Sequence, residues 1–188
     1  PVDLFFDKIK VRLGAMLFSD PRLSNDGKYT CTSCHDLRNG GVDHRKTALT
    51  RSGPGHRNVL TLFNSRFNLA QVWDGRFNSI EEDAEATVTN PDTFNSSWPE
   101  IIRRLEDNKS YPGLFQKVYP DGISKKNIIN AISEFLRSLV TVNAPFDRYL
   151  RGDENAISHR AKLGYTHFKE YGCTACHNGV SVGGNMFQ

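Results

Sequence analysis

The sequence lacks a long hydrophobic run, and it lacks a marked excess of one charge. Hydrophobic residues make up 38% of the 188 residues. No stretch approaches the roughly 18 consecutive apolar residues that a membrane-spanning helix needs. Lys and Arg number 24 against 21 Asp and Glu, and the two signs are interspersed. We therefore expect a soluble protein with no membrane span, and the charge pattern gives no support for nucleic-acid binding.

Cysteine is also scarce, with four in the whole chain. Four cysteines in a chain of this length would make a sparse disulfide framework. All four belong to two copies of Cys-x-x-Cys-His, at residues 31–35 and 173–177. A four-cysteine zinc site or a redox dithiol would use the cysteine pairs, but neither explains the histidine that follows each pair at once.

The two copies instead predict covalent attachment of two c-type haems. Two thiols at this spacing can add to the two vinyl groups on one edge of a porphyrin, and the histidine that follows can then ligate the iron. The predicted attachment residues are Cys31, Cys34, Cys173 and Cys176, and the predicted iron ligands are His35 and His177. The cofactors expected from the sequence are therefore two covalently bound haem c groups.

The surroundings of the two motifs are repeated as well. Residues 13–18 precede the first motif as Leu-Gly-x-x-x-Phe, and residues 163–168 precede the second with the same pattern. A pair of glycines follows each motif, at residues 40–41 and 183–184. These repeats predict two related modules, each with a helix that leads into the haem-binding turn and a glycine loop that leaves it.

Hydrophobic periodicity is helical along the chain and indicates no strand, so the predicted fold class is all-α. We expect helices at residues 4–17, 81–88, 99–105, 125–140 and 155–171, the fourth of them N-capped by Ser124. The break at residues 143–145 divides the chain into a domain at 1–144 and the start of a second at 145–188. Because only a short segment follows His177, we expect the second domain to be incomplete in this chain.

Further short motifs stand in a fixed order around the haem sequences. They are Leu13-Gly-x-x-Leu-Phe18, Asp20-Pro-Arg-Leu-Ser24, Gly40-Gly41-Val42-Asp43, Arg57-Asn58 with Thr61 and Asn64, Gln71-x-Trp73-Asp74-Gly75-Arg76, Asn90-Pro91, and Phe146-Asp147-x-Tyr149-Leu150. With these motifs the sequence resembles the bacterial di-haem cytochrome c peroxidase and MauG family, from Leu13 nearly to the end.

The resemblance implies two cytochrome c-like domains, each with one haem. Peroxide would react at the haem on His35, and the haem on His177 would relay electrons. Trp73 matches a tryptophan that lies between the haems in the family, although a core aromatic beside an Asp-Gly turn is the alternative. Asn58 matches a residue of an interdomain calcium site.

The resemblance also implies the partners and the location. Hydrogen peroxide would be the substrate, and a small electron-donor cytochrome or copper protein would be the partner. A protein substrate would take the donor's place in a MauG-like oxidase. Covalent haem attachment implies assembly outside the bacterial cytoplasm, so we expect a periplasmic protein, and a homodimer remains open.

The sequence departs from the family at two positions near the first haem. Typical members have a Glu two residues after Asn-Pro, where this chain has Thr93. Cleavage of the peroxide bond needs a group that moves a proton between the two oxygens. Asp92 is the nearest carboxylate and our candidate for that role, with Asp83 and Glu85 as further candidates.

The second departure is in the loop after the first glycine pair. Many members carry a histidine there that caps the resting haem, and Arg51 aligns near that position. We expect the neighbouring His44 and His56 to be exposed loop residues and not iron ligands.

Three functions follow from this sequence. The first is reduction of hydrogen peroxide to water with electrons from a small redox protein. The second is a MauG-like oxidation of residues in a partner protein through high-valent haem iron. The third is electron transfer by a di-haem carrier without peroxidase activity. The same two haems serve all three functions, so sequence alone separates them poorly.

Overall fold

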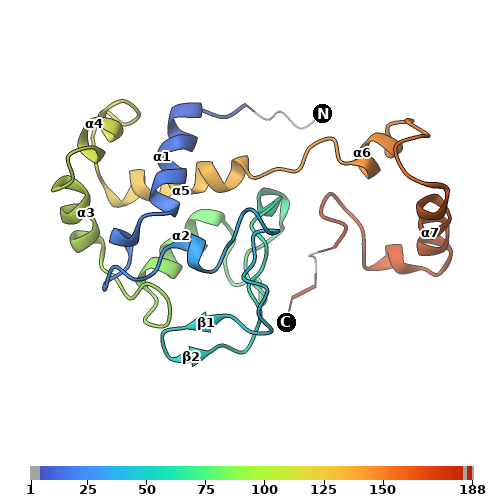
Figure 1. Ribbon diagram of the computed structural model, residues 1–188, viewed down its shortest axis with the longest axis horizontal. Coiled ribbons are helices and arrows are strands. Elements are labelled where there is room, and N and C mark those ends of the chain that lie inside the picture. Colours follow the sequence, from blue (N-terminus) through green and yellow to red (C-terminus); the bar gives the residue numbers. More distant parts are fainter. Residues whose placement is uncertain (1–4, 184–185, 188) are drawn as a thin grey trace.

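The computed structural model describes residues 5–183 and 186–187, and its described part is helical with long loops (Figure 1). The helices are α1 (Lys8–Phe18), α2 (Ile80–Thr89), α3 (Trp98–Glu106), α4 (Tyr111–Gln116), α5 (Lys125–Ser138), α6 (Pro145–Leu150) and α7 (His159–Glu170). Two short strands, β1 (Leu49–Thr50) and β2 (Gly53–Pro54), pair antiparallel as a hairpin, with Leu49 opposite Pro54.

The five predicted helices are confirmed as α1, α2, α3, α5 and α7, with ends that differ by a few residues. Two helices were not predicted, α4 and α6, and each is a six-residue helix with Pro in its first turn. Helices this short show too few turns to produce a readable hydrophobic period. The β1–β2 hairpin was also unexpected, since its two-residue strands carry no alternating pattern.

The α1–α5 pair forms the centre of the core (Figure 1). Asp7 caps α1 by accepting from the backbone N–H groups of Ile9 and Lys10, and α1 buries Leu13, Leu17 and Phe18. A Cβ at Gly14 would lie 2.0 Å from the Ala131 carbonyl oxygen on α5. The two backbones therefore approach so closely that only glycine fits at this crossing.

Helix α5 begins as the sequence predicts. The Ser124 hydroxyl accepts from the backbone N–H of Asn127, which satisfies one of the free donors at the helix start. Its apolar face is buried against α1 and α2 and includes Ile128, Ala131, Ile132 and Leu136. This helix therefore packs against both α1 and α2.

In the last third of the chain, the described residues form no buried core. Leu136 is the last buried residue along the described part of the chain. Helices α6 and α7 are held together by three aromatic rings, of which Phe146 and Tyr165 meet edge to face at 5.0 Å and Tyr149 meets Tyr165 at 6.3 Å. In Figure 1 these two helices lie apart from the α1–α5 pair.

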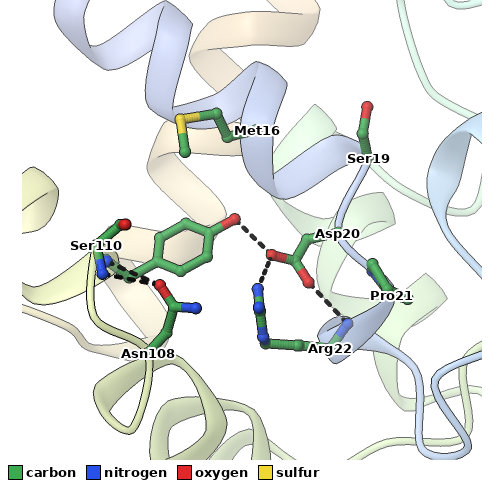
Figure 2. Close-up of a pocket in the computed structure, with 8 residues that line it drawn as sticks. Met16, Ser19, Asp20, Pro21, Arg22, Asn108 and Ser110 are labelled. Atoms are coloured by element: carbon green, nitrogen blue, oxygen red, sulfur yellow. Dashed lines mark hydrogen bonds and ion pairs between the residues drawn. The ribbon is translucent and has the colours of Figure 1, made fainter.

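A recess of about 460 Å³ lies between α1 and α4, and its polar groups are paired with one another. Figure 2 shows the buried Asp20 carboxylate, which accepts from the Arg22 guanidinium at 2.6 Å and from the Arg22 backbone N–H at 2.9 Å. The Tyr111 hydroxyl donates to the same carboxylate at 2.6 Å. Burial, followed by this hydrogen bond, raises the pKa of Tyr111. The cluster fixes the end of α1 to the start of α4.

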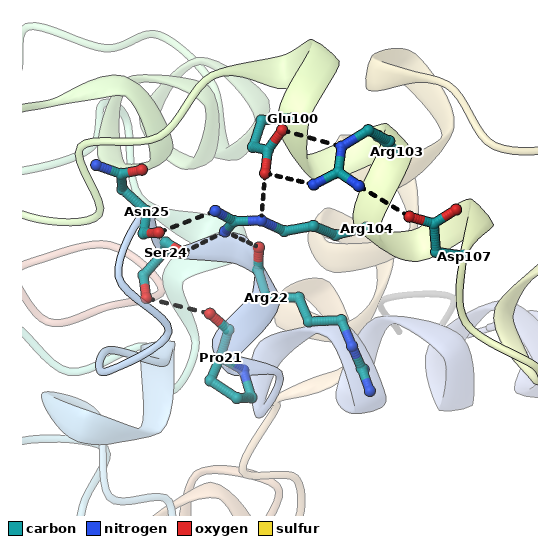
Figure 3. Close-up of polar contacts among 8 residues, drawn as sticks. All are labelled: Pro21, Arg22, Ser24, Asn25, Glu100, Arg103, Arg104 and Asp107. Atoms are coloured by element: carbon teal, nitrogen blue, oxygen red, sulfur yellow. Dashed lines mark hydrogen bonds and ion pairs between the residues drawn. The ribbon is translucent and has the colours of Figure 1, made fainter.

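A second polar cluster holds the segment that leads to the first haem motif (Figure 3). The Arg104 guanidinium donates to the carbonyl oxygens of Ser24 at 2.7 Å, Asn25 at 2.9 Å and Arg22 at 3.2 Å. Glu100 orients it by accepting from Arg104 Nε at 2.8 Å. One side chain on α3 thus satisfies three carbonyls of a loop that makes few regular backbone hydrogen bonds.

We predict that Arg104→Met lowers the free energy of unfolding by about 2–3 kcal/mol, because hydrogen bonds from a charged donor are lost and carbonyl groups are left unpaired. Arg103→Met is the matched control. Arg103 binds Glu100 and Asp107 on the surface with 61% of its side chain exposed, against 23% for Arg104. Arg103→Met should lower the free energy of unfolding by no more than about 0.5 kcal/mol. Urea unfolding measures both values, and equal losses in the two variants would contradict the prediction.

Candidate haem sites

The two Cys-x-x-Cys-His motifs fold into the same turn. The first cysteine of each pair begins a short 3₁₀ helix, Cys31–Ser33 in the first motif and Cys173–Ala175 in the second, and the second cysteine is the C-cap residue of that helix. In both turns the backbone N–H of the histidine donates to the carbonyl of the first cysteine at 2.9 Å, and that of the second cysteine donates to the same carbonyl at 3.2 Å. The repeat seen in the sequence is therefore a repeat of backbone conformation.

Each histidine is oriented by a backbone carbonyl of the loop that follows it. His35 Nδ1 lies 3.0 Å from the Gly41 carbonyl oxygen, and His177 Nδ1 lies 3.2 Å from that of Val182. A carbonyl can only accept, so Nδ1 carries the proton in both rings. The lone pair on Nε2 is then left for a metal, which is how iron-ligating histidines are held.

The loop around Gly41 has little freedom to move. Gly41 has φ +73°, and a Cβ there would lie 3.1 Å from the Thr61 hydroxyl and 3.2 Å from the Phe63 ring. The Thr61 hydroxyl donates to the Gly40 carbonyl at 2.7 Å. Sequence analysis noted the glycine pair but not its task, which is to place the carbonyl that holds His35.

The structure pairs the two glycine loops one residue out of step with the repeat seen in the sequence. The Gly41 N–H donates to the Asp36 carbonyl at 2.8 Å, and the Gly183 N–H donates to the Asn178 carbonyl at 2.9 Å. Gly183 is therefore the counterpart of Gly41, and Val182, with φ +50°, is the counterpart of Gly40. Gly184 lies outside the described residues.

The phenylalanine of each Leu-Gly-x-x-x-Phe repeat lies next to its histidine. The Phe18 ring is 6.4 Å from that of His35, and the Phe168 ring is 5.9 Å from that of His177. The helix that leads into each motif thus ends against the ring of the predicted iron ligand. Sequence analysis identified the repeat and did not predict this contact.

Titration properties of the first site fit a neutral imidazole. Burial lowers the pKa of His35, so the ring is uncharged at neutral pH and its Nε2 can bind a metal. Burial raises the pKa of the Cys31 thiol to about 12 and also raises that of Cys34. All four cysteines are free of disulfide bonds. The chain therefore supplies, twice, two free thiols and one histidine whose Nδ1 is held by a backbone carbonyl, which fits haem c.

Trp73 lies in the loop that precedes α2. Its indole N–H donates to the backbone carbonyl of Asn58 at 2.9 Å. Two residues on, a Cβ at Gly75 would come within 3.0 Å of three ring atoms of Phe187, which belongs to the segment that follows the second motif. Figure 1 shows this segment returning towards the loops of the first module.

Asn58 is exposed, and its described contact is made by its backbone carbonyl. Within residues 5–183 and 186–187, no group of three or more His, Cys, Asp or Glu side chains is placed to hold a metal ion. The predicted calcium site therefore rests on Asn58 and on the family resemblance.

Asp92 and Thr93 lie in the loop after α2. Asp92 is exposed, accepts from the Ser52 hydroxyl, and its carbonyl accepts from the backbone N–H of Arg51 at 2.9 Å. The Thr93 hydroxyl donates to the Thr87 carbonyl, which closes the loop. The two side chains thus hold the end of α2 and the tip of the β1–β2 hairpin.

The expected loop residues are found on the surface. His44 and His56 are exposed, and His44 Nε2 lies 2.8 Å from the Asn39 carbonyl oxygen. Arg51 forms an ion pair with Asp26 at 2.9 Å and lies over the Tyr29 ring at 5.4 Å. Arg51 therefore ties the hairpin to the segment just before the first haem motif.

Asp83 has a different environment from the other candidate carboxylates. It is half-buried on α2, and burial raises its pKa from the ordinary value of 3.8 to about 6. Glu85, on the same helix, forms an ion pair with Lys125.

Comparison with known proteins confirms the resemblance. Residues 8–155 match the family described as di-haem cytochrome c peroxidase. The cytochrome c peroxidase Ccp of Escherichia coli is 45% identical over 190 residues, which span 100% of this chain and 41% of that protein. The cytochrome c551 peroxidase of Nitrosomonas europaea is 40% identical over 178 residues, or 94% of this chain and 53% of that protein. MauG of Methylorubrum extorquens is 37% identical over 177 residues, which span 90% of this chain and 49% of that protein.

Solved structures agree on the fold. A MauG-like protein associated with microbial copper homeostasis superposes with a TM-score of 0.87 at 26% identity, over 100% of this chain and 57% of that one. The diheme peroxidase BthA from Burkholderia thailandensis superposes with a TM-score of 0.71 at 19% identity, over 97% of this chain and 52% of that one.

The chain spans about half the length of the relatives that it matches. The curated relatives named here are cytochrome c peroxidases, which are oxidoreductases, and MauG. The match over residues 8–155 and the identity of up to 45% lead to one conclusion: the chain belongs to the di-haem cytochrome c peroxidase family.

Proposed function

We propose that the protein containing this chain reduces hydrogen peroxide to water with electrons from a small redox protein. The observation that carries the proposal is the pair of matching turns, each with two free thiols and a histidine whose Nδ1 is held by a backbone carbonyl. One peroxide takes up two electrons and two protons to give two waters. Two haems in one chain allow electrons to be received at one site and used at the other.

We propose that peroxide reacts at the His35 site and that the His177 site relays electrons. Residues of the core lie at the first site, where Phe18 packs beside the His35 ring and Cys31 packs against the core cluster. Haem c, when bound through the cysteines, supplies an iron that exchanges electrons with a peroxide oxygen. Gly41 and Thr61 would hold the His35 ring as a ligand to this iron, and Phe18 packs beside that ring.

We further propose a domain boundary at residues 144 and 145. The core ends at Leu136, and α6 begins at Pro145. Gly164 is the counterpart of Gly14, yet nothing lies within 4 Å of a Cβ built there, and Leu163 beside it is 50% exposed. By analogy with the α1–α5 crossing, a further helix would complete the second domain at this face.

The location, the calcium ion and the assembly also stay proposals. Assembly of covalent haem supports a periplasmic protein, and no helix of the described residues is long and apolar enough to cross a membrane. Asn58 would supply one oxygen ligand to a calcium ion between the domains. A homodimer remains open, and a small cytochrome or copper protein is the proposed electron donor.

The first prediction from this proposal concerns haem content. The haem-loaded protein should carry two covalent haems, which survive acid-acetone extraction and stain after denaturing electrophoresis. Cys31→Ala with Cys34→Ala should leave one haem, and so should Cys173→Ala with Cys176→Ala. Intact mass counts the haems directly. Retention of two haems in either double variant, or release of haem on extraction, would contradict the assignment.

The second prediction concerns the reaction. The haem-loaded protein should consume peroxide in proportion to the oxidation of a reduced small cytochrome or copper protein, at two electrons per peroxide. Oxidation of residues in a partner protein, without use of such a donor, would favour the MauG-like alternative. A protein that exchanges electrons with donors but does not react with peroxide would be the di-haem carrier.

The third prediction concerns Trp73. Trp73→Phe removes the N–H that binds the Asn58 carbonyl and replaces the indole between the modules. It should slow electron transfer between the haems while both remain bound, and the lost hydrogen bond should cost about 1 kcal/mol of stability. Flash reduction followed by absorption spectroscopy measures the transfer rate.

Trp98→Phe is the matched control for this experiment. Trp98 lies on α3, and its buried indole N–H makes no hydrogen bond within the described part of the chain. The change in side chain is identical, and interhaem transfer should stay at the wild-type rate. An unchanged rate in Trp73→Phe would mean that Trp73 is a core aromatic beside the Asp-Gly turn.

A further inference from the structure

A second hollow, of about 360 Å³, lies next to the recess around Asp20. Met16 lines both hollows, and Figure 2 shows its side chain at the Asp20 recess. The second hollow is formed by side chains of α1 and by residues of α4 and its C-cap, and we call it the α1–α4 groove. Its lining consists of four apolar and three basic residues, namely Ile9, Leu13, Met16 and Leu114 with Lys8, Arg12 and Lys117.

The apolar side chains of the α1–α4 groove are partly open to solvent. Leu13 is buried in the core, but Ile9 is 54% exposed and Met16 is 37% exposed. These three residues follow one another at spacings of four and three, so they lie along one face of α1. Exposed apolar side chains that gather in a hollow are typical of a protein-binding surface, and a flexible Met side chain adapts to what it contacts.

The basic side chains of the groove have no counterions. Lys8, Arg12 and Lys117 are exposed, and their side chains make no hydrogen bond or ion pair within the residues that the structure describes. Arg22, at the neighbouring recess, is by contrast paired with Asp20 at 2.6 Å. Unpaired cations beside an apolar surface attract a partner of negative charge.

The sequence around the groove is biased towards the same charge. The whole chain has 24 basic and 21 acidic residues, but residues 8–18 hold three basic residues and no acidic one. Residues 111–117 hold one basic residue and no acidic one. The carboxylate of Asp7, just before α1, is engaged with the backbone N–H groups of Ile9 and Lys10. The near balance of charge along the chain therefore conceals a local excess of positive charge.

We propose that the α1–α4 groove binds an acidic segment of a partner protein, with one apolar side chain of that segment seated among Ile9, Met16 and Leu114. Carboxylates that flank this side chain pair with the three cations of the groove. Burial of the apolar side chain supplies most of the affinity, whereas the charges speed the encounter and make it sensitive to salt. Binding here transfers no electron or proton, so it stands or fails independently of the proposed function.

The shape and composition of the groove favour a protein segment over other acidic partners. A bilayer surface takes up apolar side chains that protrude from a protein, whereas Ile9 and Met16 line a hollow. Nucleic acids are held mainly through contacts of cations and polar groups with phosphates. Here three cations share a hollow with four apolar side chains. An apolar side chain flanked by carboxylates matches both parts of this lining.

The binding test uses the haem-loaded protein and a synthetic peptide in which one Leu is flanked on both sides by Glu residues. Isothermal titration calorimetry should detect binding that weakens as salt is raised from about 20 mM to about 300 mM, because salt screens exposed charges. Replacement of the peptide's Leu by Ala should weaken binding by about tenfold or more. A diazirine group at the Leu position should cross-link to α1 or to the segment of α4 and its C-cap.

Two double variants test the cations. Arg12→Gln with Lys117→Gln should weaken binding by about fivefold or more, because two charge contacts are lost. Lys46→Gln with Lys126→Gln is the matched control and should bind like the wild type. Both of these lysines are exposed, lie outside the groove and have no ion pair in the described part of the chain. The two double variants change the net charge equally, so a difference between them reports position.

A further pair of variants tests the apolar lining. Ile9→Gln should weaken binding by about threefold or more, because a buried apolar contact is lost. Leu69→Gln is the control, since Leu69 is an apolar side chain that is 74% exposed outside the groove. Each variant should keep the absorption spectrum and the melting temperature of the wild type, which shows that the fold and the haems are intact.

Several results would overturn the proposal. Equal losses in the two double variants would show attraction to net charge alone. Equal binding of the Leu and Ala peptides, cross-linking elsewhere on the protein, or no binding up to about 1 mM peptide would exclude the groove as a docking site. Binding of anionic phospholipid vesicles in place of the peptide, lost in Arg12→Gln with Lys117→Gln, would assign the groove to a membrane surface instead.

Discussion

The hydrogen bond from His35 Nδ1 to the Gly41 carbonyl is the constraint on which the first site depends. It fixes the tautomer and leaves Nε2 open, so an imidazole that could rotate freely becomes a directed ligand. The loop can supply that carbonyl only because Gly41 adopts φ +73° in a space too tight for a side chain and because Thr61 holds Gly40. The long loop after the motif is therefore part of the site. Its contacts with Asp92 and Asp26 connect the same loop to the end of α2 and to the segment before Cys31.

A second constraint comes from the helices that carry the motif. Gly14 lets α1 cross α5 in backbone contact, and Phe18 at the end of α1 then reaches the His35 ring. Arg104 holds the connecting loop through three carbonyls. The second module repeats the turn, the carbonyl and the phenylalanine, but Gly164 faces open space. The local sequence alone therefore forms the turn. A helix packed against the module adds burial.

Much of this could be predicted from sequence, for identifiable reasons. Ser124 begins α5 because its hydroxyl caps the helix, and the spacing of apolar residues gave α1, α2, α3 and α7. The cysteines and histidines of both sites were predictable because haem attachment requires local spacing. Short elements such as α4, α6 and the hairpin have no period to detect. The carbonyl that binds His35 was invisible, since backbone acceptors leave no mark on residue type, and the true counterpart of Gly41 appears only in the hydrogen-bond pattern.

The candidate carboxylates named from sequence lie in different surroundings. Asp92 adjoins the position where relatives have Glu, yet a loop residue faces whichever way its turn directs, and here the turn directs Asp92 to Ser52 and solvent. Asp83 lies on α2, within the range at which its charge acts on the Cys31 thiol. Burial opposes folding whenever Asp83 is charged, because a desolvated carboxylate loses hydration that the nearby charge of Arg76 offsets only in part. The same burial raises the pKa of Asp83 to about 6, so the contribution of this carboxyl to stability falls as the pH rises from the ordinary aspartate range towards that value.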